Sequence, residues 1–394
     1  MTTDNALQLR NHLVDALKRR GSIQSPAVEA AFRTVPRHLF VPHRTAADAY
    51  RDDAIPTRWE HGLPTTSSSQ PGIMAVMAEQ LAPAPGHRVL EIGAGTGYNA
   101  AILRELVGAA GRVVTIDIQP DVAERAGAHL RTAGYADVEV IAGDGGFGHP
   151  AGAPYDRIIV TASLSDVAPP WVAQLGDGGR LLLPLRLGTT CLCVAFDRAG
   201  EELRSISVEC CGFMMLKGAY GTDDPAADTS MVPMGDGLFL SAPGLPSVPL
   251  GLLQSLLNQP PRRVGGLIVP VNALGFGGGL AIYLALSEPG MINIFTSNPE
   301  AWGFHAVGGL FEPRERSLCL IRPDAVVVYG SDAAAQRMQR RAEEWVALGR
   351  PGYADVRVVA RPAAAEQPTS PRTWVVRRRW YSFAVSFVEP LTPA

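Results

Sequence analysis

The chain has 394 residues, enough for two or three domains with buried cores. Apolar residues make up 46% of it, which excludes wholesale disorder, and a net charge of −3 gives no reason to expect a nucleic-acid partner. Its 5 cysteines form no CxxC pair, so the sequence supports neither a disulfide framework nor a metal site. The N-terminus carries charges throughout and no signal peptide, so we expect a cytoplasmic protein with reduced cysteines.

The first 60 residues predict helices followed by loops. A hydroxyl-rich stretch, "TTSSSQP" (65–71), then precedes an apolar run at helical spacing. Ser69 is a candidate N-cap of this helix, and Pro71 suits its first turn because it has no N–H to leave unpaired. One serine is enough for capping, so the additional hydroxyls indicate a surface that holds a polar group.

Short apolar strands alternate with helices from residue 86 to about 220. "HRVLEIG", "RVVTIDI", "VEVIAGD" and "YDRIIVTAS" read as buried strands separated by helical segments. This alternation predicts an α/β fold, a doubly wound parallel sheet covered on both faces, of the Rossmann-like kind. Ligands of such sheets bind at the carboxyl ends of the strands.

A stretch rich in Asp, Pro and Gly begins at residue 222 and reads as a linker. We therefore divide the chain into an N-terminal α/β domain, 1–221, and an additional C-terminal α+β domain, 222–394. Residues 264–287 are uncharged and long enough to span a bilayer. Their 6 glycines and one proline favour two buried strands, or a strand and a short helix, so we expect no membrane association.

The sharpest motif is "VLEIGAGTGYNAA" (89–101), in which a strand ends near Glu91 and a glycine turn leads into a helix. Gly93, Gly95 and Gly97 let the backbone approach a ligand without Cβ atoms in the way. The spacing is G-x-G-x-G, not the dinucleotide G-x-G-x-x-G, and Glu91 would repel a pyrophosphate. An acid at this place suits a cationic amino-acid ligand such as S-adenosyl-L-methionine.

Two further strand ends carry carboxylates. Asp117 ends the second strand, where it can accept hydrogen bonds from both hydroxyls of a ribose. Asp144 and Gly145 follow the third strand and are predicted to meet the adenine edge. The alternative is that these are ordinary turn glycines of a doubly wound domain without this ligand. Acids at the ends of three successive strands make that alternative the weaker one.

The sequence resembles the protein-L-isoaspartate O-methyltransferases over roughly residues 7–218. The motifs that carry the resemblance are "VPRHLFVP", "AYRDDAIP", "SSSQP", "VLEIGAGTGYNAA", "GDGGFG", "APYDRIIVTAS" and "QLGDGGRLLLPL", in the order and spacing of that family. The resemblance implies that the hydroxyl stretch lies beside the transferable methyl group, with Ser69 at the family's catalytic serine and Ser67 at its usual threonine. It also implies esterification of a carboxylate, closure to a succinimide and hydrolysis to aspartate or isoaspartate.

Two departures from the family bear on the substrate. "TTSSSQP" replaces the usual "TISQP", and about 170 residues follow the point where the repair enzymes end. The N-terminal segment and "CGFMMLKGA" (211–219) look most like a branch found with lanthipeptides, which methylates an L-aspartate in a modified, cyclised precursor. The resemblance therefore implies a ribosomally made precursor peptide as the partner, gripped by the C-terminal domain. The identity of the peptide, the fate of the succinimide and the oligomeric state stay open.

Two other functions remain open: a repair enzyme for isoaspartyl damage with an appended domain, and an inactive methyltransferase fold that binds peptides. The run "TWVVRRRWYSF" (373–383) either binds an acidic leader segment or is an exposed strand face beside core aromatics. The predicted catalytic residues are Ser67, Ser68 and Ser69, and the predicted cofactor residues are Glu91, Gly93, Ala94, Gly95, Thr96, Gly97, Asn99, Asp117, Ile118, Asp144, Gly145 and Thr161.

Overall fold

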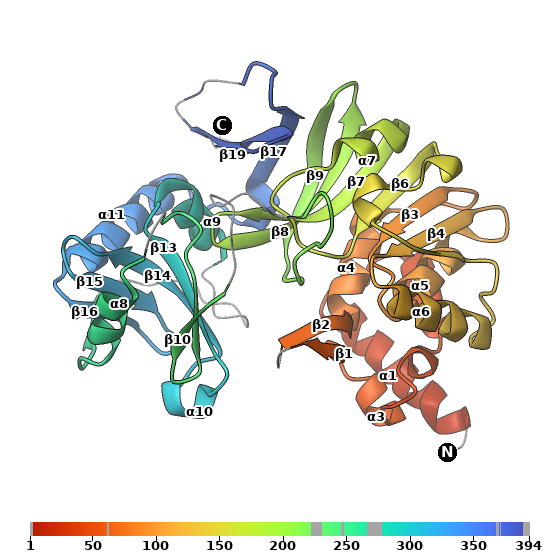
Figure 1. Ribbon diagram of the computed structural model, residues 1–394, viewed down its shortest axis with the longest axis horizontal. Helices are drawn as coiled ribbons and strands as arrows, with labels where there is room; N and C mark the ends of the chain where they lie inside the picture. The colour runs from red at the N-terminus through yellow and green to blue at the C-terminus, as the bar shows by residue number, and fades with distance from the viewer. Residues whose placement is uncertain are drawn as a thin grey trace.

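The computed structural model describes residues 3–60, 63–221, 231–245, 248–265, 278–367, 370 and 372–388. Two sheets organise this part of the chain, one of ten strands and one of seven, and a two-stranded hairpin stands beside them (Figure 1). We refer to the ten-stranded sheet as the first sheet and to the seven-stranded one as the second sheet.

The first sheet has the strand order β18–β19–β17–β9–β8–β7–β6–β3–β4–β5. Its strands are β3 (Arg88–Ile92), β4 (Arg112–Asp117), β5 (Glu139–Ala142), β6 (Tyr155–Val160), β7 (Leu175–Leu187), β8 (Thr190–Ala199), β9 (Glu202–Cys210), β17 (Val356–Pro362), β18 (Thr373–Arg377) and β19 (Tyr381–Phe387). Strands β3 to β7 pair in parallel, and β7 onward pair antiparallel. The parallel half is the predicted doubly wound sheet, and its order reverses between β3 and β6.

Apolar faces of helices cover both sides of the first sheet. Its helices and the adjoining hairpin are α1 (Thr3–Arg19), α2 (Pro26–Thr34), α3 (Ala46–Ala49), β1 (Ile55–Glu60), β2 (Leu63–Ser68), α4 (Pro71–Leu81), α5 (Tyr98–Val107), α6 (Pro120–Thr132) and α7 (Pro169–Gln174). Helices α1, α2, α4 and α5 bury one face in a core that includes Phe32, Leu81 and Ile102. The opposite face packs on α7 through the fully buried Trp171. The expected helical start of the chain is confirmed, whereas residues 55–60, expected as loop, form a strand.

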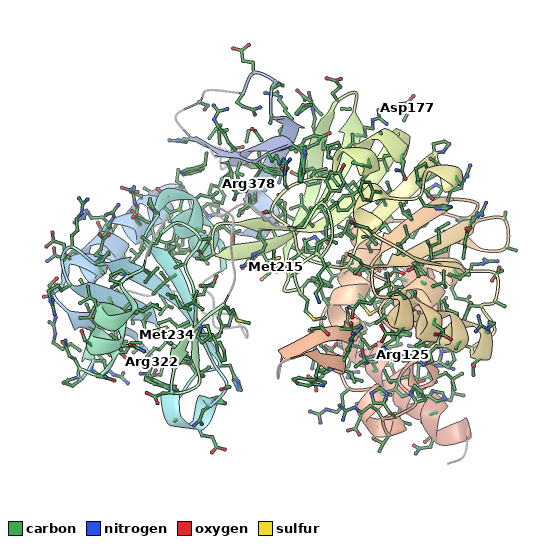
Figure 2. The ribbon with its side chains drawn as sticks, in the orientation of Figure 1. Arg125, Asp177, Met215, Met234, Arg322 and Arg378 are labelled. Atoms are coloured by element: carbon green, nitrogen blue, oxygen red, sulfur yellow. The ribbon has the colours of Figure 1, made fainter. Side chains whose placement is uncertain are left out.

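The second sheet is antiparallel, with the order β10–β11–β13–β14–β15–β16–β12. Its elements are β10 (Val232–Gly235), β11 (Leu238–Ser241), α8 (Leu250–Leu257), β12 (Arg262–Arg263), α9 (Gly278–Ser287), β13 (Met291–Thr296), α10 (Pro299–Trp302), β14 (Ala306–Glu312), β15 (Ser317–Ile321), β16 (Val326–Gly330) and α11 (Ala333–Ala347). Helix α8 covers one face and helices α9 and α11 cover the other. Met234 and Arg322 mark this part in Figure 2.

Helix α9 joins the two sheets. Its Ile282 lies in the core of the first sheet, while Leu280 and Leu284 lie in the core of the second. At the turn between β7 and β8, a Cβ on Gly188 would lie 2.8 Å from the carbonyl oxygen of Ala285. The uncharged run 264–287 falls largely outside the described residues, but its last ten residues form this helix, as in the alternative of a strand and a short helix. No helix among the described residues is long and apolar enough to cross a membrane.

The last three strands return to the first sheet. Val359 and Ala360 of β17 pair with Arg204 and Leu203 of β9, so residues 356–387 extend the sheet that strands β3 to β9 begin. Asp166, in the loop after β6, accepts hydrogen bonds from the backbone N–H groups of Trp380 (2.7 Å) and Tyr381 (3.1 Å). The predicted division at residue 221 stays a prediction, since the linker residues 222–230 lie outside the described part and the sheets divide the chain differently.

The aromatic residues of the 373–383 run face the interior. Trp374 packs edge-on against Tyr283 and Phe387, with ring centroids 5.6 and 5.8 Å apart, and Trp380 contacts Tyr220 at 4.8 Å. Tyr381 is buried in the core of the first sheet. This packing corresponds to the interpretation in which the arginines lie on an exposed strand face and the aromatic side chains beside them belong to the core.

Candidate active site

A cavity of about 1740 Å³ opens at the carboxyl ends of β3, β4 and β6. Its walls come from the hydroxyl strand β2, the start of α4, the segment 211–217 and, on the far side, the second sheet. Met215 lies where the two parts of the molecule face each other (Figure 2). The cavity is therefore a junction of the two sheets and not only a pocket of the catalytic segment.

Glu91 lies at the floor of this cavity, on β3, and is fully buried. Its carboxylate accepts a hydrogen bond from Nδ2 of Asn99 (2.7 Å) and another from Oγ1 of Thr115 (2.6 Å). Burial raises the pKa of Glu91 to about 7 despite these two donors. Glu91 thus links the first turn of α5 to β4 beneath the glycine loop.

The glycine loop needs the absence of Cβ atoms at two points along the cavity. Gly93 has φ +101°, and a Cβ there would collide with Oγ1 of Thr161, which donates to the Gly93 carbonyl (2.8 Å). A Cβ on Gly95 (φ +53°) would lie 3.2 Å from the carbonyl oxygen of Ser67. Gly97 lies outside the cavity lining and allows α5 to start close to α6, near Leu130.

Asp117 ends β4 at the rim of the glycine loop. Its Oδ2 accepts from the Gly95 N–H (3.1 Å) and its Oδ1 from the Gln119 N–H (3.0 Å), which orients the carboxylate toward the cavity. Burial raises the pKa of Asp117. Ile118 follows it in the lining.

Asp144 lies differently from its predicted place. Its carboxylate accepts from the backbone N–H groups of Gly146 (2.9 Å) and Ala219 (2.7 Å), and it is not part of the cavity lining, whereas Gly145 is. Ser163 continues the same attachment, donating from Oγ to the Phe213 carbonyl (2.8 Å). These bonds hold the segment 211–219 across the mouth of the cavity.

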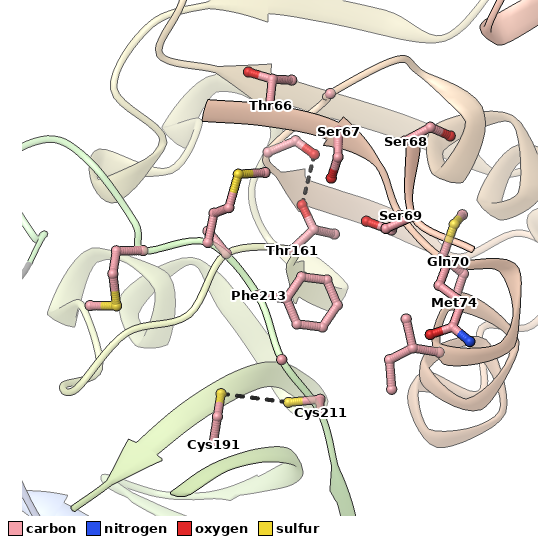
Figure 3. Close-up of a pocket in the computed structure, with 18 of the residues that line it drawn as sticks. Thr66, Ser67, Ser68, Ser69, Gln70, Met74, Thr161, Cys191, Cys211 and Phe213 are labelled. Carbon is pink, nitrogen blue, oxygen red and sulfur yellow. Dashed lines mark hydrogen bonds between the residues drawn. The ribbon is translucent and has the colours of Figure 1, made fainter. Parts of the chain in front are cut away.

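The hydroxyl stretch forms β2 and its exit. Ser67 and Ser69 point toward Thr161 and Phe213, and Ser68 points the other way (Figure 3). Ser68 is 2% exposed, and its Oγ has no hydrogen-bond partner among the described residues. All three serines line the cavity.

The capping interpretation of Ser69 is wrong. Helix α4 has Gln70 at its N-cap with no side-chain hydrogen bond, and the Gly72 N–H is instead satisfied by Oδ1 of Asp52 (2.7 Å). Asp52 comes from the loop before β1 and reaches the helix across the fold. The Ser69 hydroxyl is therefore not committed to the helix start.

Arg37 positions Ser69, a role that its place in "VPRHLFVP" does not by itself indicate. Its side chain is fully buried and donates to four backbone carbonyls, those of Ser69 (2.9 Å), Asp53 (3.1 Å), Ala49 (2.8 Å) and Arg51 (3.0 Å). A buried guanidinium with this many acceptors fixes the loop 49–53 against the end of β2.

Every predicted site residue except Gly97 and Asp144 lines the one cavity. Sequence reasoning missed the wall that the second sheet contributes, where Ser241 of β11 and Asn293 of β13 line the cavity together with Phe304 of the loop before β14. Isolated residues in strands carry no motif by which they could have been recognised. Within the described residues no group of three or more His, Cys, Asp or Glu is placed to hold a metal ion.

A doubly wound sheet with this glycine loop and a strand-end Asp117 defines a class I S-adenosylmethionine-dependent methyltransferase, and S-adenosyl-L-methionine is its cofactor. The glycine loop leaves the backbone free to approach a ligand, and Asp117 presents a carboxylate beside it, so the residues present fit this cofactor. Residues 8–219 match the family described as protein-L-isoaspartate(D-aspartate) O-methyltransferase (PCMT), and the chain belongs to that family.

Relatives agree with this assignment. The protein-L-isoaspartate O-methyltransferase of Methanoregula boonei is 43% identical over 215 residues, which cover 55% of this chain and 95% of the relative. That of Hyperthermus butylicus is 41% identical over 234 residues, covering 57% and 95%. A solved structure titled protein-L-isoaspartate O-methyltransferase has a TM-score of 0.53 at 22% identity and covers 89% of this chain and 96% of its own. The fold of that structure therefore extends well beyond the segment that the two relatives match.

Proposed function

We propose that this protein esterifies the free carboxylate of an isoaspartyl residue in proteins or peptides. The observation that carries the proposal is the close approach of the hydroxyl strand to the glycine loop, where the Ser67 carbonyl lies 3.2 Å from the Cβ position of Gly95. This approach places Ser67 and Ser69 beside the predicted cofactor residues. The names of the relatives that are 43% and 41% identical support the same substrate class.

The cofactor residues we propose are the glycine loop and Asp117, with Glu91 beneath them. When bound, S-adenosyl-L-methionine supplies an electrophilic methyl group. A carboxylate acceptor is already ionised at neutral pH, so the protein needs no general base. The tasks left to the chain are to orient the acceptor and to exclude water, which contributes through positioning. We assign the first to the hydroxyls of Ser67 and Ser69 and the second to Phe213 and Met214, which line the cavity opposite them.

Methylation of an L-aspartate in a modified, cyclised lanthipeptide-like precursor, leading through a succinimide to isoaspartate, is the second candidate. The volume of the cavity favours this candidate, since about 1740 Å³ between two sheets is more than a cofactor and one substrate side chain fill. The presence of residues beyond 221 does not favour the precursor peptide as substrate. The solved protein-L-isoaspartate O-methyltransferase structure described above shares its fold over 89% of this chain. The isoaspartyl substrate is therefore our first proposal.

One experiment separates the candidates. The full-length protein is given S-adenosyl-L-methionine with a labelled methyl group and three peptides of one sequence: linear isoaspartyl, linear L-aspartyl, and thioether-cyclised L-aspartyl. Base-labile methyl ester is measured over time. We expect the isoaspartyl peptide to be the best acceptor. Preference for the cyclised L-aspartyl peptide would establish the precursor-modifying role instead, and no ester on any peptide, with cofactor binding retained, would leave the peptide-binding role.

A further inference from the structure

Arg186 lines the cavity, and no acidic side chain of the described residues forms an ion pair with it. It sits on β7 opposite Cys191 of β8, and its Nε is buried. Within the described part of the chain its guanidinium makes no hydrogen bond or ion pair with another side chain or carbonyl. Arg186 as a whole is half-buried, and enclosing part of a cation without such partners has a cost that an acidic ligand would offset.

The two titratable groups that interact with Arg186 do not balance its charge. They are the thiols of Cys191 and Cys211, whose sulfur atoms are 3.7 Å apart. The hydrogen bond with Cys211 and burial raise the pKa of Cys191, and burial raises the pKa of Cys211, so both thiols are neutral. The cavity acids Glu91 and Asp117 have their own donors around the glycine loop.

Two more polar groups without partners lie at the same junction of the sheets. Oγ1 of Thr189, in the turn after β7, and Oγ of Ser241, at the end of β11, are buried and have no hydrogen-bond partner among the described residues. Both residues line the cavity, Thr189 being 8% exposed and Ser241 1%. Hydroxyl groups enclosed in this way ordinarily find a partner.

Asn293 shows that Thr189 and Ser241 belong together. Its Nδ2 donates to the Thr189 carbonyl (2.8 Å), which bridges the first sheet and the second. Asn293 is also the cross-strand partner of Ser241, so the two side chains share a face of the second sheet. Ser241 therefore lies on the side of the second sheet that faces the β7–β8 turn. Thr189 of this turn follows Arg186 by three positions in the chain.

We propose that Arg186, Thr189 and Ser241 form a subsite for a second carboxylate of the peptide substrate, separate from the carboxylate that is methylated. One guanidinium and two hydroxyl donors suit a carboxylate, with which an arginine makes paired, charge-assisted hydrogen bonds. The subsite uses residues of both sheets, so the second sheet takes part in selecting the peptide. This inference rests on the proposed function, because it assumes a peptide acceptor at Ser67 and Ser69.

The test uses full-length protein and isoaspartyl peptides in matched pairs. In one series a glutamate at each of four positions after the acceptor is replaced by glutamine; in the other the C-terminal acid is replaced by its amide. The two series distinguish a side-chain carboxylate from a chain terminus. For the peptide pair with the larger difference, we expect KM to be about 10- to 100-fold lower for the acidic peptide than for the neutral one. This is the change in affinity expected from one charge-assisted hydrogen bond.

Arg186→Gln should raise KM for the acidic peptide to that of its neutral counterpart, while KM for the neutral peptide and kcat change by less than about threefold. Ser241→Ala should give a smaller change in the same direction. Arg204→Gln is the matched control, because Arg204 is exposed and pairs with Glu202 outside the cavity. The thermal midpoint of Arg186→Gln should equal or exceed that of the wild type, since an unpaired cation is removed.

Each other outcome counts against the subsite. Equal KM values for acidic and neutral peptides in the wild type would overturn it while leaving the proposed function intact. A fall of several degrees in the midpoint of Arg186→Gln would show that Arg186 serves stability instead. If neither peptide is methylated, the proposed function fails and the subsite fails with it.

Discussion

The two ends of the cavity are built in opposite ways. Around the glycine loop the protein satisfies its own polar groups: Glu91 accepts from Asn99 and Thr115, and Asp117 accepts from two backbone N–H groups. At the junction with the second sheet, Arg186 and Ser241 have polar atoms without partners among the described residues. The first end is arranged in advance for one constant ligand. The second has donors left over, as expected where a variable substrate must supply the acceptors.

The largest effect that would test this contrast concerns Glu91. Its pKa is raised to about 7, so between about pH 4.5 and 7 the folded protein holds a proton that the unfolded chain has released, and stability falls as pH rises through this window. Glu91→Gln removes that dependence. We expect the variant to be more stable than the wild type by about 3 kcal/mol at pH 8 and nearly equal at pH 4.5.

Urea unfolding of both proteins at the two pH values measures this difference. Titratable groups that both proteins share contribute equally to the pH dependence of unfolding, so they cancel in the difference. A constant difference between pH 4.5 and 8 would mean that the Asn99 and Thr115 donors keep Glu91 ionised throughout.

Asp117→Ala should weaken binding of S-adenosyl-L-methionine by about 10- to 100-fold, because charge-assisted hydrogen bonds are worth about 1.5–3 kcal/mol each. Titration calorimetry is the measurement. Asp137→Ala is the control: this acid is exposed, pairs with Arg104 and does not line the cavity. Unchanged affinity in Asp117→Ala would remove Asp117 from the cofactor site.

Ser69→Ala should lower the single-turnover rate of methyl transfer roughly tenfold, the value of one hydrogen bond to a charged group, with cofactor affinity within a few fold of the wild type. Ser68→Ala is the control, since Ser68 points away from Thr161 (Figure 3). Equal rates for the Ser69 and Ser68 variants would show that the hydroxyl of Ser69 has no part in orienting the acceptor.

The smallest effect concerns the join between the returning strands and the catalytic part. Asp166→Asn weakens acceptance from the N–H groups of Trp380 and Tyr381, and we expect a loss of about 1 kcal/mol at pH 5, where the wild-type carboxyl is largely protonated. Because burial raises the pKa of Asp166 to about 6, the wild type loses stability as pH rises through 6, so the loss should shrink toward pH 8. Thermal unfolding at pH 5 and pH 8 measures both, and a variant as stable as the wild type at both values would contradict the join.

Contacts between residues close together in the sequence could be predicted, and contacts between residues far apart in the sequence could not. The glycine loop, Glu91 and Asp117 were predictable because a strand, a turn and a helix adjacent in the chain bring them together. Ser241 and Thr189 meet through Asn293, and nothing local in the sequence marks such a meeting. Asp144 was expected at the cavity, but its carboxylate is engaged by Ala219, a contact across 75 positions.

The returning strands show the same limit. The apolar runs at 356–361 and 381–388 favour strands, but pairing partners depend on which sheet edge is open, and that edge belongs to β9. The capping interpretation of Ser69 failed for a related reason, because the residue that satisfies Gly72 is Asp52, from another part of the fold. Propensity identifies what an element is, and only the assembled fold decides what it contacts.

The pairing of β9 with β17 also bears on how the protein is made. As the chain leaves the ribosome, β9 is synthesised long before β17, so the unpaired N–H and C=O groups of its outer edge stay uncovered until residues 356–362 emerge. The whole second sheet is translated in that interval. A nascent chain halted within the second sheet therefore carries a long open strand edge, and chaperone engagement at that stage would protect it from pairing with a neighbouring chain.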